Sequence, residues 1–180
     1  MPQARVVAFL RAINVGGHTV KMDRLRALFE ELGLKNVETF IASGNVLFDA
    51  PSADATKLEG RIERHLEKAL GYEVLTYIRP LASLASVATE HPFTSHEADG
   101  HALSIGFLKA ALDEERSAAL EALANGYDEF HLSNRQVYWL CRGRMSDSKL
   151  FGKTLDRALG APATFRNVTT VRKLAAKAPA

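Results

Sequence analysis

The sequence predicts an α+β fold made of two ferredoxin-like (split βαβ) units, the second degenerate, followed by C-terminal helices. The pattern of the first half predicts strand, helix, strand, strand, helix and strand, which is the order of elements in that unit. Part of the same order returns in the second half. The chain has 180 residues, 47% apolar and 24% charged, a composition typical of a soluble globular protein. The predicted parts are a ferredoxin-like half at 1–79, a helix and linker at 80–101, and a second α+β half at 102–180.

The first half shows the two periodicities that distinguish strands from helices. Residues 6–10 form a continuous apolar run, typical of a strand covered on both faces. Apolar residues then recur at helical spacing until Gly33, which is placed to end a helix. A Ser-Gly-Asn turn between two β-rich runs predicts a hairpin. The predicted strands are 6–10, 37–41, 46–48 and 72–78, and the apolar stripes of the predicted helices span 22–32 and 58–70.

The second half repeats this pattern less completely. A short helix begins at Pro80 and ends before Pro92, and a polar linker follows it. The motif Phe107-Leu108-Lys109-Ala110 resembles Phe9-Leu10-Arg11-Ala12, which favours an internal duplication. The predicted strands are 102–108, 127–132 and 136–141, and the predicted helices lie at 113–124, around 150–159 and at 168–174.

Charge and cysteine content narrow the classes of function. The 23 basic and 21 acidic residues nearly balance, so anion binding has to be local rather than driven by a strong overall field. The single Cys141 cannot form an intrachain disulfide, which favours a cytoplasmic location. The apolar run 6–10 is too short for a signal sequence or a membrane span. The six histidines lack zinc-ligand spacing, so we expect no metal and no cofactor.

Polar residues and glycines follow the first predicted strand directly. In a split βαβ unit the first two strands run parallel, so the loop after the first strand and the hairpin after the second emerge at the same end of the sheet. A glycine pair before a helix can present backbone N–H groups to an anion, and basic and amide side chains can add charge and direction. The sequence therefore predicts a small anion pocket formed by Arg11, Asn14, Gly16, Gly17, Lys21, Ser43 and Asn45.

Each of these features also has a plainer interpretation. Two glycines before a helix commonly form only a tight turn. An arginine at a strand end can extend its charged head into water, and Lys109 at the matching place favours that interpretation. Ser43-Gly44-Asn45 is also ordinary hairpin chemistry. Only the convergence of these residues favours a ligand.

A second polar group lies near the C-terminus. Asn167 is a good N-cap for the last predicted helix, and this role competes with ligand binding. Arg166 beside it is placed to make another anion contact. We predict Arg166 and Asn167 as further candidate binding residues, without assigning their position relative to the first group.

Several short motifs in order resemble those of a known family. They are Leu10-Arg11-Ala12-Ile13-Asn14-Val15-Gly16-Gly17, Ser43-Gly44-Asn45-Val46, His91-Pro92-Phe93 and Thr164-Phe165-Arg166-Asn167. With these motifs the chain resembles the bacterial domain of unknown function 1697 family over nearly its whole length. The resemblance implies an α+β fold with ferredoxin-like units and implies no activity. The chain departs from the family at Ala12, where glycine is more usual, and at Phe165, where a small polar residue is usual.

Three hypotheses for function follow. The first is a protein, enzyme or not, that binds a small phosphate- or carboxylate-bearing ligand at the sheet end. The second is a nucleic-acid-binding module that presents Phe9 or Phe48 on an open sheet beside a basic C-terminal helix. The third is a structural or protein-interaction domain whose polar loops are turns and caps. No membrane partner is expected, and the sequence does not indicate an oligomeric state.

Overall fold

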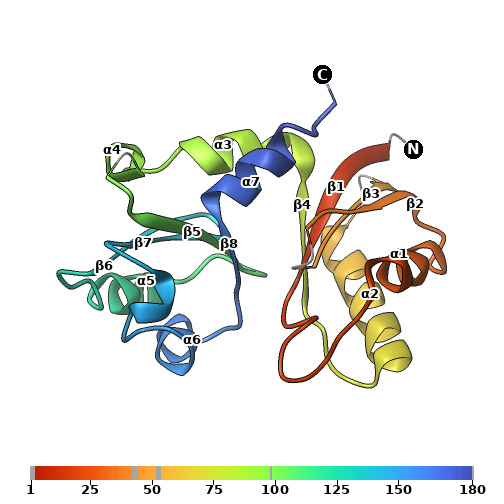
Figure 1. Ribbon diagram of the computed structural model, residues 1–180, viewed down its shortest axis with the longest axis horizontal. Helices are drawn as coiled ribbons and strands as arrows, with labels where there is room; N and C mark the ends of the chain where they lie inside the picture. The colour runs from red at the N-terminus through yellow and green to blue at the C-terminus, as the bar shows by residue number, and fades with distance from the viewer. Residues whose placement is uncertain (1–2, 42–43, 52–53, 98, 180) are drawn as a thin grey trace. The chain divides into compact units, whose positions relative to one another are not determined.

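The chain folds into two compact α/β units, each with a four-stranded antiparallel sheet (Figure 1). The computed structural model describes residues 3–41, 44–51, 54–97 and 99–179. One unit comprises Met1–Ser83 with Lys177–Ala180, and the other comprises Leu84–Ala176. The predicted mixture of helices with antiparallel sheets is confirmed.

The first unit is organised around its first strand. In the sheet order β2-β3-β1-β4, β1 pairs antiparallel with both β3 and β4. Since β2 is also antiparallel to β3, β1 and β2 run in the same direction. The elements are β1 (Gln3–Leu10), α1 (Met22–Glu30), β2 (Lys35–Thr39), β3 (Asn45–Pro51), α2 (Ala55–Leu70), β4 (Thr76–Pro80) and the 3₁₀ turn Leu81–Ser83.

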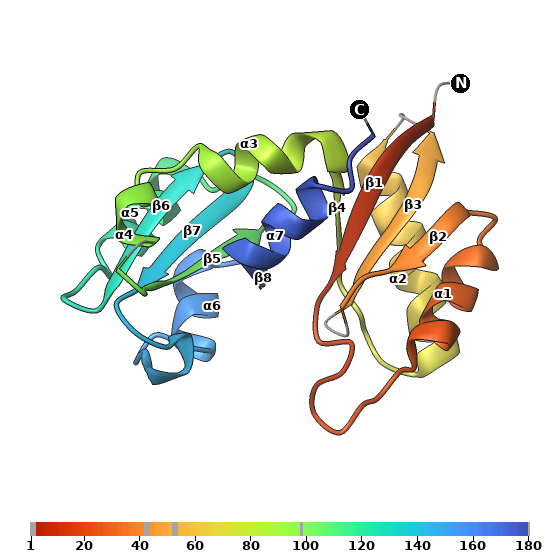
Figure 2. The same cartoon turned by 45° about the horizontal axis from the view of Figure 1, so that its top comes forward.

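Helices α1 and α2 lie against the first sheet (Figure 2). They contribute to one apolar core with alternate residues of β1. The Phe29 and Phe48 rings meet there with their centroids 5.6 Å apart. The intervening residues Val7 and Phe9 of β1 are also buried. Strand β1 is therefore covered on both faces, as its unbroken apolar run predicts. The core includes Val6, Ala8 and Leu10 of β1, Leu25 and Leu28 of α1, and Ile62 and Leu66 of α2.

Two glutamates of α2 occupy backbone donors of the edge strand β4. The Thr76 N–H donates to Glu63 Oε1 and the Ile78 N–H donates to Glu59 Oε1, both at 2.8 Å. Glu59 is buried, and a buried carboxylate needs such donors. The same contacts blunt an edge that could otherwise pair with another chain.

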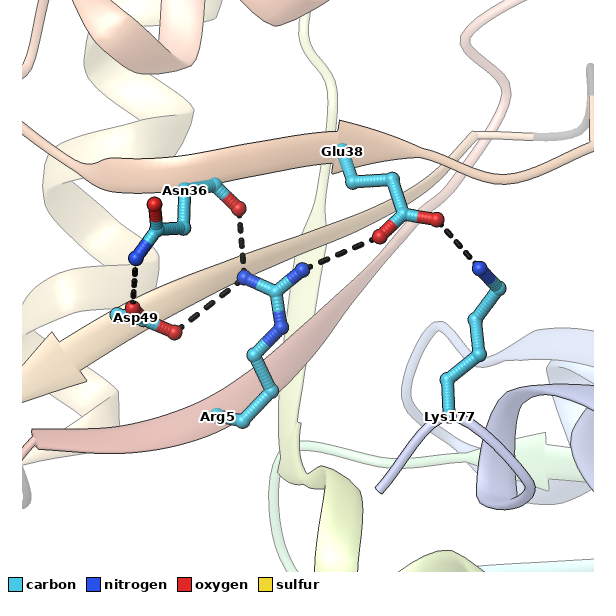
Figure 3. A network of polar contacts seen from close by, with 5 residues as sticks. All are labelled: Arg5, Asn36, Glu38, Asp49 and Lys177. Atoms are coloured by element: carbon cyan, nitrogen blue, oxygen red, sulfur yellow. Dashed lines mark hydrogen bonds and ion pairs between the residues drawn. The ribbon is translucent and has the colours of Figure 1, made fainter. Parts of the chain in front are cut away.

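A polar network on β1, β2 and β3 includes Lys177, which lies three residues before the end of the sequence (Figure 3). Arg5 lies opposite Asp49 in the β1–β3 register and is 3.3 Å from both Asp49 Oδ1 and Glu38 Oε2. Lys177 donates to the other carboxylate oxygen of Glu38. The Glu38 side chain is about 40% exposed and the Lys177 side chain about a third exposed. Because water screens the ion pair between them, the pair stabilises the unit little.

The second unit has the strand order β6-β7-β5-β8. This is the order of the first unit with every strand number raised by four, so the two sheets share one connectivity. The elements are α3 (Leu84–Thr89), α4 (Thr94–Glu97), β5 (Ala102–Phe107), α5 (Glu114–Glu121), β6 (Asp128–Ser133), β7 (Gln136–Cys141), the 3₁₀ turn Met145–Asp147, α6 (Lys153–Leu159), β8 (Thr164–Asn167) and α7 (Val168–Ala175).

The last strand of the second unit corrects the sequence prediction. We predicted a degenerate second unit, with residues 164–167 leading into the last helix, but these residues form β8 against β5. Phe165 lies opposite Gly106 in this pairing and packs edge-on against Trp139, with ring centroids 5.7 Å apart. A Cβ on Gly106 would lie 2.6 Å from the Phe165 ring. The missing side chain of Gly106 therefore makes room for Phe165.

We expect Gly106→Ala to destabilise the protein by about 1–3 kcal/mol, because the added methyl group overpacks the site that holds Phe165. The second change Phe165→Leu should recover part of this loss in the Gly106→Ala background. Urea unfolding of both single variants and the double variant measures the coupling.

Gly126→Ala is the matched control, since no atom lies within 4 Å of a Cβ built there. Equal stability changes for Gly106→Ala and Gly126→Ala would contradict this account of β8.

Candidate functional site

The loop between β1 and α1 is fixed by three side-chain contacts. The Asn14 Oδ1 accepts from the Val20 N–H at 2.8 Å, which closes the loop near its base. The Tyr72 hydroxyl donates to the Ile13 carbonyl at 2.8 Å. The His18 ring stacks on Tyr72, with centroids 3.8 Å apart and planes inclined by 19°. These contacts give a surface loop a defined shape.

The glycine pair of this loop leaves its backbone open. Gly16 and Gly17 have φ angles of +68° and +86°, and no atom lies within 4 Å of a Cβ built at either position. Ala12 also has a positive φ, +60°. This left-handed region favours glycine, which gives a physical reason for the glycine that the resembled family more often has there. The loop ends at Lys21, an exposed N-cap residue that makes no side-chain cap to α1.

The turn between β2 and β3 lies beside this loop, as the parallel direction of β1 and β2 predicts. The Leu10 N–H donates to the Gly44 carbonyl at 2.8 Å. A Cβ on Gly44, whose φ is +81°, would lie 2.8 Å from Ile13 Cγ2, so turn and loop pack closely. The predicted binding residue Ser43 lies outside the described residues.

Arg11 and Asn45 both make contacts within the protein. Asn45 is buried, and its Nδ2 donates to the Phe40 carbonyl at 2.9 Å across the turn. The partly exposed Arg11 hydrogen-bonds the side chain of Tyr77 on β4. Burial raises the pKa of Tyr77 to about 12, against the smaller lowering effect of Arg11. The phenol is therefore protonated at neutral pH, and Arg11 is held at the end of the sheet.

The family model described as "Protein of unknown function (DUF1697)" matches residues 4–138. The chain belongs to this family. This DUF1697 chain is also similar to a solved structure, that of conserved bacterial protein SP0830 from Streptococcus pneumoniae, with a TM-score of 0.75 and 24% sequence identity. The match covers 97% of this chain and 98% of the other, and shows that the two share a fold. No curated protein matches the sequence.

Arg166 and Asn167 belong to the second unit of the DUF1697 chain. The Asn167 Oδ1 accepts from the Thr169 N–H at 2.8 Å and so caps α7. Arg166 is buried in β8, where its Nη1 donates to Thr164 Oγ1 at 2.8 Å and to the Phe165 carbonyl at 2.9 Å. Burial lowers the pKa of Arg166 to about 10, so the side chain keeps its charge at neutral pH.

A buried carboxylate in the second unit was missed by the sequence analysis. Asp128 Oδ1 accepts from Trp139 Nε1 and Ser148 Oγ, both at 2.8 Å, and from Cys141 Sγ at 3.5 Å. Asp128 Oδ2 accepts from Asn125 Nδ2 at 3.1 Å. Burial, with a smaller contribution from Asp128, raises the pKa of Cys141 to about 12. The thiol is therefore protonated, which agrees with its interpretation as a buried strand residue rather than a nucleophile.

The aromatic side chains that the nucleic-acid hypothesis names are not exposed. Phe9 and Phe48 are both fully buried, so neither ring is presented for base stacking on an open sheet, as the nucleic-acid hypothesis requires.

Among the described residues, no helix is long and apolar enough to cross a membrane. In the same part of the chain, no three or more His, Cys, Asp or Glu side chains are grouped so that they could hold a metal ion.

We expect Gly44→Ala to destabilise the protein by about 1–3 kcal/mol more than Gly16→Ala. Both changes place alanine at a positive φ, which costs on the order of 1 kcal/mol. Only the Gly44 change also forces a methyl group against Ile13, which adds overpacking. Urea denaturation of the two variants compares them directly, and equal losses would show that the turn and the loop are not packed together.

Proposed function

We propose that the DUF1697 chain binds a small phosphate- or carboxylate-bearing ligand on the loop between β1 and α1. The observation that carries the proposal is the combination of a fixed loop with an open glycine pair. Asn14, His18 and Tyr72 hold the loop, while Gly16 and Gly17 have empty space above their backbone. A loop ordered before binding loses little entropy when a ligand arrives.

Charges at the two ends of the loop support an anionic ligand. Arg11 is partly exposed at the start and Lys21 is exposed at the end. A guanidinium can bind a carboxylate or phosphate in bidentate fashion, and successive backbone N–H groups near glycines can form a concave anion site. The chain's small formal net charge of +2 fits recognition at short range rather than attraction from a distance.

The other predicted residues have different roles in the proposal. Asn14 and Asn45 shape the loop and the turn, because Asn14 accepts from the Val20 N–H and Asn45 donates to the Phe40 carbonyl. Ser43 is proposed as a ligand contact from its place in the sequence alone, directly before Gly44. Arg166 and Asn167 are left out, since they hold β8 and cap α7.

We also infer that each unit is ferredoxin-like. The strand orders β2-β3-β1-β4 and β6-β7-β5-β8 support this inference, as does the βαββαβ order of elements in each unit. A cytoplasmic location is proposed on the single cysteine of the sequence.

Thermal unfolding with inorganic phosphate, pyrophosphate or citrate tests the binding proposal. At equal ionic strength, at least one anion should raise the Tm of the unchanged protein by a few degrees, as ligand at about 100 times its Kd would. Arg11→Ala and Lys21→Ala should lose at least about half of that shift, because each removes a charge that assists binding.

Each variant is compared with its own ligand-free Tm, so that a stability change caused by losing the Arg11–Tyr77 contact does not count as lost binding. Lys68→Ala removes an exposed charge from the last turn of α2 and is the control. If Arg11→Ala and Lys21→Ala keep the same anion shift as Lys68→Ala, or no anion stabilises the unchanged protein, the proposal is wrong.

A further inference from the structure

We propose that the second unit holds a separate site for a small organic cation with an aromatic body. A cavity of about 500 Å³ opens there between the segment before β6 and the segment before α6. This volume lies within the range of small-molecule sites. Its lining residues are Asn125, Tyr127, Asp128, Asp147, Lys149 and Leu150.

Within the part of the chain that the structure describes, Asp128 has only neutral hydrogen-bond donors. Its donors are an indole N–H, a hydroxyl, a thiol and an amide, and all four are neutral. Neutral hydrogen bonds satisfy the oxygens of a carboxylate but do not cancel its charge. Among the described residues no cationic side chain is ion-paired with Asp128, and a buried charge without a counter-charge in direct contact is costly. The cavity that Asp128 lines offers space for a cation.

The two carboxylate oxygens of Asp128 accept unequal numbers of hydrogen bonds. Oδ1 receives three donors from Trp139, Ser148 and Cys141, whereas Oδ2 receives one from Asn125. A carboxylate can accept about four hydrogen bonds in all, roughly two on each oxygen. The less occupied oxygen is thus on the side of Asn125, which also lines the cavity. Asp128 is only 1% exposed, so we expect it to attract a cation in the cavity at a distance rather than by direct contact. The electrostatic field of its carboxylate is strong there because water is excluded.

The other residues that line the cavity favour a ligand with an aromatic body. Tyr127 donates its hydroxyl to the Arg144 carbonyl at 2.5 Å, which fixes the position of its ring. Together with Leu150, this ring gives the cavity apolar wall surface suited to an aromatic body. Asp147 is paired with Arg144 at 3.1 Å. Among the lining residues Lys149 is the cation, and its charge opposes a positively charged ligand. Removing its charge should therefore strengthen binding.

Three one-ring probes that differ in charge test the site. Benzylammonium, benzyl alcohol and benzoate have closely similar shapes and carry a positive, zero and negative charge. Trp139 is the only tryptophan of the chain and donates to Asp128, so its single indole N–H resonance reports on the site. In ¹H–¹⁵N spectra, benzylammonium should shift this resonance saturably with a Kd in the millimolar range. Benzyl alcohol should bind at least about tenfold more weakly, and benzoate should not bind.

Lys149→Glu should tighten benzylammonium binding by about three- to tenfold, because it replaces the opposing charge at the rim. Lys153→Glu makes the same charge change at an exposed position of α6 outside the lining and should have a smaller effect. Asp128→Asn should abolish the preference for the cation over the alcohol. If Asp128→Asn does not fold, the comparison of Lys149→Glu with Lys153→Glu still tests whether the cation binds in this cavity.

Three results would overturn the proposal. They are no saturable shift with benzylammonium, equal affinity for the ammonium and the alcohol, and equal effects of Lys149→Glu and Lys153→Glu. None of these results bears on the anion site of the first unit, because that site is probed with different ligands and different residues.

Discussion

The pairing of β1 on both sides is the constraint on which the first unit depends. Because β3 and β4 both hydrogen-bond to β1, the strand cannot shift without breaking two ladders. At its last residue the Leu10 N–H donates to the Gly44 carbonyl, and one residue beyond the strand the Arg11 N–H donates to the Leu75 carbonyl. The loop after β1 therefore starts from a fixed point, and its side-chain contacts fix the rest.

The two units show how one framework can carry different loops. The Leu108 N–H after β5 donates to the Arg135 carbonyl at 2.9 Å, the counterpart of the Leu10–Gly44 contact. The residues after β5, Lys109-Ala110-Ala111-Leu112, contain no glycine, unlike the loop after β1. The hydrogen-bonding frame is shared, whereas the open glycine pair is specific to the first unit. This difference favours a specialised role for the first loop over a purely structural one.

The sequence predicted the features that depend on local periodicity and turn chemistry. The nearness of the β1 loop to the β2–β3 turn followed from strand order alone. Strand β8 was missed because four mostly polar residues give no periodic signal, and the fit of Phe165 against Gly106 depends on a long-range pairing. The Asp128 network was missed because its partners, from Asn125 to Ser148, meet only after β6 and β7 have paired. The sequence signal that could have indicated this network is Asp128 itself, a single aspartate at the start of an apolar strand.

A crystal structure of the protein soaked with pyrophosphate tests most directly whether the loop after the central strand is the binding site. The account predicts the anion within hydrogen-bond distance of the Gly16 or Gly17 N–H and of the Arg11 guanidinium, with the loop unchanged in shape. The same soak of an Arg11→Ala crystal should show the site empty. An anion bound only elsewhere, or bound equally in the Arg11→Ala crystal, would contradict the claim.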